Sequence, residues 1–198
     1  TRFDRAEQVQ SAQSPRPRPP LEARPDQLSV TQIETLLHNP YEIYAKKILN
    51  LREWEPVDAP ASAAHRGTLL HGLMEGLVRT NGHKSEDIAG ALMALARDAQ
   101  KDRPGGAAVL QYWQARLVGL SQWVADYETQ RQGEVETSYT EVQGELTLDV
   151  LGAPFRVTAK ADRIDKRHDG RFDIIDYKTG QPPSKSSVEK HLSPQLTL

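Results

Sequence analysis

Apolar residues recur at helical spacing through the first two thirds of the chain. The stretch RGTLLHGLMEGLVRT predicts a helix over 67–79, whose apolar face is formed by Leu70, Leu73, Met74 and Leu77. The same spacing predicts four more helices, over 29–39, 41–49, 85–101 and 106–131. Ser85 is expected to cap the helix that runs to residue 101.

The first of these helices has the clearest start and stop signals. Ser29 or Thr31 is placed to cap it, because Gln32 or Glu34 follows three residues later, as in a capping box. Pro40 then ends it.

From Glu134 onward the pattern changes to the alternation that is typical of strands. Three strands are predicted as a meander, over 138–150, 154–165 and 171–178. A last helix is expected to begin near Ser186 and to be still running at Leu198. Helices followed by a small sheet and a further helix predict an α/β or α+β layer fold.

Composition narrows the classes of protein that fit this pattern. The chain has 198 residues, 37% hydrophobic and 26% charged, with a net charge of −2, so a soluble globular domain with appendages is expected. Contact with nucleic acid then has to come from local basic patches. The chain has no cysteine, which excludes disulfides, thiolate zinc sites, cysteine-held iron–sulfur clusters and cysteine nucleophiles.

The chain also lacks the usual membrane and secretion signals. No apolar run reaches the roughly 18 residues that a membrane span needs, and no signal-peptide core is present, so a cytoplasmic protein without membrane contact is expected. Residues 1–27 are polar and rich in Pro and Arg, which predicts a linker or a strap over a neighbouring surface.

The stretch RIDKRHDGRFDIIDYKTG brings candidate chemistry together in one hairpin. Residues 168–170 (HDG) suit a three-residue loop, and counting back along both strands pairs Asp162 with Asp176. Their Cβ atoms would be about 4.5–5.5 Å apart. Two carboxylates at that distance repel unless one is protonated or a divalent cation lies between them, and hard cations prefer oxygen ligands. Lys178 shares the face of Asp176 and is placed to hold a phosphate oxygen or to orient a water.

The residues alone leave other interpretations open. The same hairpin fits a solvated face of alternating charge, formed by Lys160, Asp162, Asp176 and Lys178. Alternation points Asp173 away from Asp176, and Asp165 is expected to be a turn residue. Taken by themselves, His71 beside the leucine stripe is a packing residue and Gln195 is an ordinary boundary residue.

Four motifs, in this order, resemble the RecB-type nucleases of the PD-(D/E)XK superfamily. RGTLLHGLMEG is similar to that family's histidine helix, AKADRID and IIDYKTG to its two strand motifs, and PQLTL to its glutamine helix. LSVTQIETLLHNPYEIYAKKIL is similar to the opening of the nuclease domain in AddB-like helicase–nuclease subunits. The resemblance covers residues 28–198, with a helical part over 28–133 and a sheet and motif part over 134–198.

The resemblance implies a restriction-endonuclease-like core, with a small mixed sheet flanked by helices and an N-terminal helical region. It implies four metal ligands for Mg²⁺, or Mn²⁺ in its place: His71, Asp162, Asp176 and the backbone carbonyl of Tyr177. The implied catalytic residues are His71, Asp162, Asp176, Lys178 and Gln195. Lys178 would polarise the attacking water or steady the transition state, and Gln195 would position the lysine or the DNA.

The chain departs from the family in three places. Many AddB-like proteins hold an iron–sulfur cluster through cysteines, one of them in a Cys-Pro dipeptide; here the dipeptide is Asn39-Pro40, so no cluster is expected. Ala159 or Ala161 stands where the strand motif usually begins with Gly. The chain stops at Leu198, so the C-terminal part of the core is expected to be missing, which would leave an unfinished sheet edge open to association.

The implied function is hydrolysis of DNA phosphodiester bonds, by an exonuclease domain of a bacterial helicase–nuclease in double-strand break repair. The implied partners are single-stranded DNA or duplex ends and an AddA-like helicase subunit. The alternatives are a catalytically silent DNA-binding or scaffolding module and a plain protein-interaction domain.

Several exposed side chains are candidates for contact with DNA. The basic ones are Lys46, Lys47, Arg66, Lys185 and Lys190, each of which also fits a solubilising surface charge. Trp54, Trp113 and Trp123 are candidates for stacking on bases, although helical spacing predicts Trp113 and Trp123 in the core.

Overall fold

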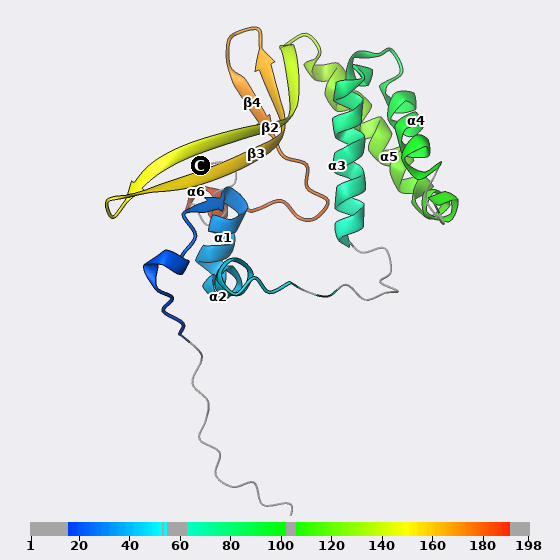
Figure 1. Cartoon of the computed structure of the whole chain (residues 1–198). Helices are drawn as coiled ribbons and strands as arrows, with labels where there is room; N and C mark the ends of the chain where they lie inside the picture. Colours follow the sequence, from blue (N-terminus) through cyan, green and yellow to red (C-terminus); the bar gives the residue numbers. More distant parts are fainter. Residues whose placement is uncertain (1–15, 53, 55–62, 102–105, 191–198) are drawn as a thin grey trace, which may run out of the picture.

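A helical layer lies beside one end of a twisted sheet (Figure 1). The computed structural model describes residues 16–52, 54, 63–101 and 106–190, with the backbone alone for 63–66 and 106–114. The helical layer consists of α3 (Ala63–Arg79), α4 (Ile88–Lys101) and α5 (Gly106–Arg131), with a 3-10 turn, η3 (Gly82–Lys84), between the first two. The predicted helices over 67–79, 85–101 and 106–131 are therefore present.

The interior of the helical layer is apolar, as the spacing predicts. Leu73 and Leu77 of α3, Leu92 of α4, and Leu117 and Val124 of α5 are all buried and form one cluster. Burial of apolar surface at this junction fixes the three helices relative to one another.

The cap of α4 differs from the prediction. Asp87 accepts a hydrogen bond from the backbone N–H of Gly90, at 2.7 Å, and α4 begins at Ile88. The hydroxyl of Ser85 instead donates to the carbonyl of Gly82 and closes η3. Ser85 and Asp87 are both good capping residues. Because Ser85 closes the 3-10 turn η3, α4 starts downstream of it, at Ile88.

A smaller helical region precedes this layer. It contains a 3-10 turn, η1 (Leu21–Ala23), then α1 (Val30–His38), α2 (Pro40–Ile43) and a π-helical turn, η2 (Tyr44–Ile48). The capping box at Ser29 is confirmed: its side chain accepts from the Gln32 backbone, and the Gln32 side chain accepts from the Ser29 backbone.

Within the described residues, the sheet has four strands rather than the three that alternation predicts. The predicted meander is formed by β2 (Val135–Val150), β3 (Ala153–Arg167) and β4 (Phe172–Ile175), each antiparallel to its neighbour. The additional strand, β1 (Gln27–Ser29), pairs with β3 in parallel. The sequence pattern does not predict β1, because three residues are too short to show a period. Its parallel pairing with β3 rests on the buried Leu28, which lies opposite the buried Val157. A mixed sheet flanked by helices confirms the predicted fold class.

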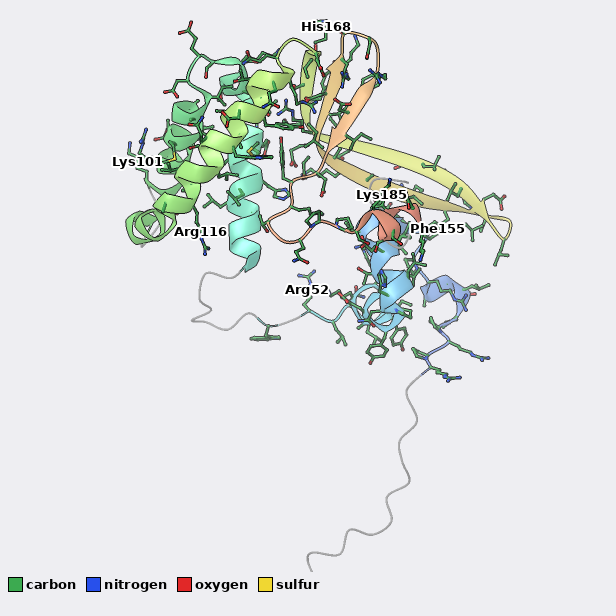
Figure 2. All side chains as sticks on the ribbon, turned by 180° about the vertical axis from the view of Figure 1, so that it is seen from behind. Arg52, Lys101, Arg116, Phe155, His168 and Lys185 are labelled. Carbon is green, nitrogen blue, oxygen red and sulfur yellow. The ribbon has the colours of Figure 1, made fainter. Side chains whose placement is uncertain are left out.

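The β2–β3 ribbon extends well beyond the helical layer as an arm (Figure 1). Figure 2 shows Phe155 on this arm, near the N-terminal helices, and His168 at the opposite end of the sheet. Leu36 and Ile43 line an apolar hollow together with Phe155. After β4 the chain loops towards α3 and then enters a short helix, α6 (Lys185–Glu189), which Ser184 caps.

Candidate active site

The β3–β4 hairpin has the predicted register. Arg163 lies opposite Ile175 and Asp165 opposite Asp173, so the next step along the ladder would place Asp162 opposite Asp176. However, β4 ends at Ile175 rather than near 178. Asp162 and Asp176 therefore stand where the ladder opens, one on a strand and the other on the loop that leaves it.

Asp162 is held by two contacts from different parts of the chain. Its Oδ2 accepts a hydrogen bond from the backbone N–H of Tyr177, at 2.8 Å. Its Oδ1 lies 3.4 Å from Nδ1 of His71, which α3 supplies. The carboxylate of Asp162 thus takes the place of a backbone acceptor for the Tyr177 N–H, which is why β4 ends before this residue. The second oxygen of the carboxylate is directed at His71.

Tyr177 connects the motif loop to the helical layer. Its ring packs against the apolar cluster of α3, α4 and α5, and it meets the His71 ring edge-on, with centroids 6.2 Å apart. Burial raises the pKa of the Tyr177 hydroxyl to about 12. The phenol is therefore neutral at physiological pH and serves as an apolar anchor, so that the backbone of residue 177 faces Asp162.

The motif lysine and the second acid form an ion pair. Nζ of Lys178 lies 2.9 Å from Oδ2 of Asp176, whose side chain is 13% exposed while that of Lys178 is 41% exposed. Lys160 pairs instead with Glu141 of β2. The acid is thus screened from water and the ammonium group is accessible.

The start of α3 approaches the same loop. A Cβ added at Gly67 would lie 3.8 Å from Oγ1 of Thr179, so this helix passes next to the residues that follow Lys178. Helix α3 therefore contacts the site twice, through His71 and near Gly67.

Two acids of the hairpin face the opposite way. Asp173 accepts from Arg131 of α5, at 2.9 Å, and so points away from Asp176 as alternation predicts. The prediction that Asp165 is a turn residue is wrong: it is fully buried and bonded to both Arg163 and Arg131. A local pattern could not show that α5 covers this end of the hairpin.

The remaining candidates lie on or next to α6 or outside the described residues. Lys185 is exposed on α6, where its partner is Glu189, and Lys190 is exposed at the end of that helix. Gln195 and the side chain of Arg66 lie outside the described residues. Among the described residues, no three His, Cys, Asp or Glu side chains converge closely enough to hold a metal ion.

The aromatic candidates differ from their predicted places. The prediction of a core position for Trp123 is wrong, because its side chain is 60% exposed and stacks on Tyr127 one turn later. Among the described side chains of α5, the buried ones are instead Leu117, Ser121, Val124 and Glu128. Trp54 is exposed, and the side chain of Trp113 lies outside the described residues.

Three charged residues near the site gave no clear signal in the sequence. Across the interface of helix and sheet, Arg163 of β3 donates to Glu128 of α5, and Arg131 of α5 donates to Asp165 of β3. The available hint was that Arg163 stands between two acids, in Asp-Arg-Ile-Asp, in a strand expected to be half-buried. A guanidinium in such a strand needs acceptors from another element.

Comparison with known protein families gives a match over most of the chain. The family profile described as the PD-(D/E)XK nuclease superfamily matches residues 27–198. The chain belongs to the PD-(D/E)XK nuclease superfamily.

The relatives are considerably longer proteins. An uncharacterised protein of Rickettsia bellii is 33% identical over 175 residues, covering 88% of this chain and 21% of that protein. One from Rickettsia conorii is 31% identical over 179 residues, with the same coverage. A subunit of the ATP-dependent helicase/deoxyribonuclease of Streptococcus agalactiae is 26% identical over 178 residues, covering 87% of this chain and 16% of that protein. The chain thus spans about a fifth of the rickettsial relatives.

None of its described helices combines the length and the apolar composition needed to cross a membrane.

Proposed function

We propose that this domain is a divalent-metal-dependent deoxyribonuclease that hydrolyses DNA phosphodiester bonds. The observation that carries the proposal is the arrangement around Asp162, which is held by the Tyr177 backbone and directed at His71 where the strand ladder opens. Asp176 and Lys178 follow on the same loop. These are the acid, acid and lysine of the motif that gives the superfamily its name.

The donor set suits a hard cation. Ligands of an octahedral ion at about 2.1 Å lie about 3 Å apart, and the 3.4 Å between Asp162 Oδ1 and His71 Nδ1 is close to that spacing. Asp162 and His71 are already at ligand spacing. We propose that Asp176 and the carbonyl of Tyr177 join them when Mg²⁺, or Mn²⁺ in its place, binds, since the described side chains do not yet converge as a set of three. Carboxylate and carbonyl oxygens with one imidazole favour these ions, and a chain without cysteine offers no thiolate for an iron–sulfur cluster.

Each residue has a distinct part in the reaction. The N–H of Tyr177 fixes the orientation of Asp162, as an outer hydrogen bond does for a ligating carboxylate. Lys178, accessible beside Asp176, would donate to the attacking water or to a phosphate oxygen. A divalent cation bound here would lower the pKa of a bound water and neutralise charge on the phosphate.

The wider setting is proposed from the relatives. The similarity to a subunit of a helicase/deoxyribonuclease supports an AddB-like nuclease domain, which we propose to be an exonuclease over 28–198 preceded by a linker over 1–27. We place it in a cytoplasmic helicase–nuclease for double-strand break repair, with an AddA-like helicase as partner. Arg66, Lys185 and Lys190 would contact DNA phosphates, and Gln195 would position Lys178 or the DNA.

Calorimetric titration of Mn²⁺ into the chain, with cleavage of single-stranded DNA assayed in parallel, tests the proposal. We expect Asp176→Ala to abolish both metal binding and cleavage, because it removes a ligand. Lys178→Ala should keep the Mn²⁺ affinity and lose cleavage by at least about 100-fold, as when a transition-state donor is removed. Glu145→Ala, which alters an exposed acid on the distant part of β2, is the matched control and should change neither.

Other outcomes have definite meanings. DNA binding without cleavage at saturating Mn²⁺ would favour the catalytically silent DNA-binding module. Cleavage that persists in Asp176→Ala would show that the hydrolysis occurs elsewhere.

A further inference from the structure

A buried guanidinium joins the sheet to the long helix directly behind the candidate site. Arg163 follows Asp162 in β3 and is 1% exposed. Its two terminal nitrogens donate to the carboxylate of Glu128 on α5, at 2.5 and 2.9 Å, and its Nε donates to Asp165, at 2.6 Å. Such a bidentate pair fixes the orientation of both partners as well as their separation.

A second guanidinium crosses the same interface in the opposite direction. Arg131 of α5 donates to Asp165 of β3 and to Asp173 of β4, both at 2.9 Å. Asp165 therefore receives one guanidinium on each of its oxygens. We call these five residues, Glu128, Arg131, Arg163, Asp165 and Asp173, the interface ion cluster.

The interface ion cluster is charged despite its burial. Burial alone would lower the pKa of Arg163, but the hydrogen bonds that it donates to Glu128 and Asp165 outweigh burial and raise that pKa above its usual value. Buried ion pairs contribute little net stability, since apolar side chains of similar volume often replace them at no loss. Such pairs do fix the separation and orientation of the elements that carry them.

That geometry reaches the candidate metal ligands by two paths. Through α5, Leu117 and Val124 pack in the apolar cluster with α3, which carries His71. Along β3, Arg163 directly follows Asp162, whose carboxylate the Tyr177 backbone holds. The contact of 3.4 Å between His71 and Asp162 thus crosses the interface between helices and sheet. The interface ion cluster sets how closely the two sides of that interface approach each other.

We propose that the interface ion cluster is a positioning device for the metal site, with Arg163 and Glu128 as its central pair. It sets where the strand that carries Asp162 lies relative to the helix that carries His71, and so it sets the affinity for the divalent cation. This inference rests on the proposed metal-dependent function.

The double variant Arg163→Met with Glu128→Leu tests it, because it removes both charges and keeps similar volumes. Asp165 keeps Arg131 as its partner. We expect the melting temperature to be close to that of the wild-type chain and the Kd for Mn²⁺, measured by calorimetry, to rise about 10- to 100-fold. Cleavage of single-stranded DNA should recover at saturating Mn²⁺, since the residues that touch the substrate remain.

The exposed ion pair between Lys166 of β3 and Glu136 of β2 supplies the control. It joins two strands of the same sheet and does not cross to α5. Lys166→Met with Glu136→Leu makes the same changes of residue type and should leave the Kd for Mn²⁺ unchanged. Arg163→Lys is the second test if the double variant does not fold: it keeps the charge but cannot reproduce the three-donor geometry, so the Kd should rise in a folded protein.

Three results would overturn the proposal. An unchanged Kd in the folded double variant, or in folded Arg163→Lys, would make the interface ion cluster a structural feature alone. A loss of cleavage at saturating Mn²⁺ with an unchanged Kd would also contradict it. A wild-type chain that neither binds Mn²⁺ nor cleaves DNA would overturn the proposed function and this inference with it, whereas the first two results leave the proposed function standing.

Discussion

His83 is an unusual residue, a buried histidine whose ring has no polar partner among the described residues. It is 4% exposed, and neither ring nitrogen has a hydrogen bond within that part of the chain. Burial, and then the positive charge of Arg163, lower the pKa of its imidazole, although Glu128 opposes the effect. The folded protein therefore holds this histidine in its neutral form.

This burial predicts a loss of stability in mild acid. Below the ordinary pKa of about 6.5, the unfolded chain binds a proton at His83 that the folded chain does not, so the free energy of unfolding falls as the pH falls towards the folded pKa. We expect His83→Leu to reduce the difference in unfolding free energy between about pH 7.5 and pH 5.5 by up to about 1.4 kcal/mol, measured by urea denaturation. His168→Gln, which changes an exposed histidine, should leave that difference as it is.

At the scale of the element, α1 shows how far a local pattern can determine structure. Ser29 is both the last residue of β1 and the cap of α1, and its bonds with Gln32 close the capping box. One residue thus ends a parallel strand and starts a helix.

We expect Ser29→Ala to lower the free energy of unfolding by about 1 kcal/mol, because it leaves a backbone N–H of α1 without its acceptor. Urea denaturation followed by circular dichroism measures the change. Ser29→Asp keeps an acceptor at the same position and should restore most of the stability; equal losses in both variants would show that the strand, not the cap, needs the serine.

At the scale of the whole molecule, the two faces of the sheet differ in character near the hairpin. One face carries the interface ion cluster and is covered by α5. The other presents a shallow apolar surface formed by Tyr139, Val142, Ile164, Phe172 and Ile174. Phe172 and Ile174 are 61% and 57% exposed. Contiguous apolar exposure of this kind promotes association.

We therefore expect the isolated chain to self-associate through this surface as its concentration rises. Phe172→Lys with Ile174→Lys should abolish the association in sedimentation velocity experiments, and the free energy of unfolding should change by no more than about 0.5 kcal/mol, since both side chains are exposed. Val150→Lys with Leu151→Lys, at the exposed tip of the arm, is the control and should leave the association unchanged. Equal effects of the two pairs would point to general solubility instead.

Much of the candidate site was predictable because its information is local. The turn residues set the hairpin register, and helical spacing placed His71 on a helix beside an apolar face. The assignments of Asp165 and Trp123 were wrong because the burial of each side chain depends on which other element covers it, and a local pattern does not contain that information.

The sequence by itself determined the three helices of the helical layer, the register of the β3–β4 hairpin, the class of fold and the order of the nuclease motifs, because each follows from periodicity, turn chemistry or spacing within a short segment. Only the tertiary structure decided that β1 joins β3, that His71 meets Asp162, and that Arg163 lies between Glu128 and Asp165. Except for the bond between Arg163 and Asp165, those contacts link residues far apart in the chain, and they form because the buried apolar cluster and the paired buried charges bring α3 and α5 against the sheet.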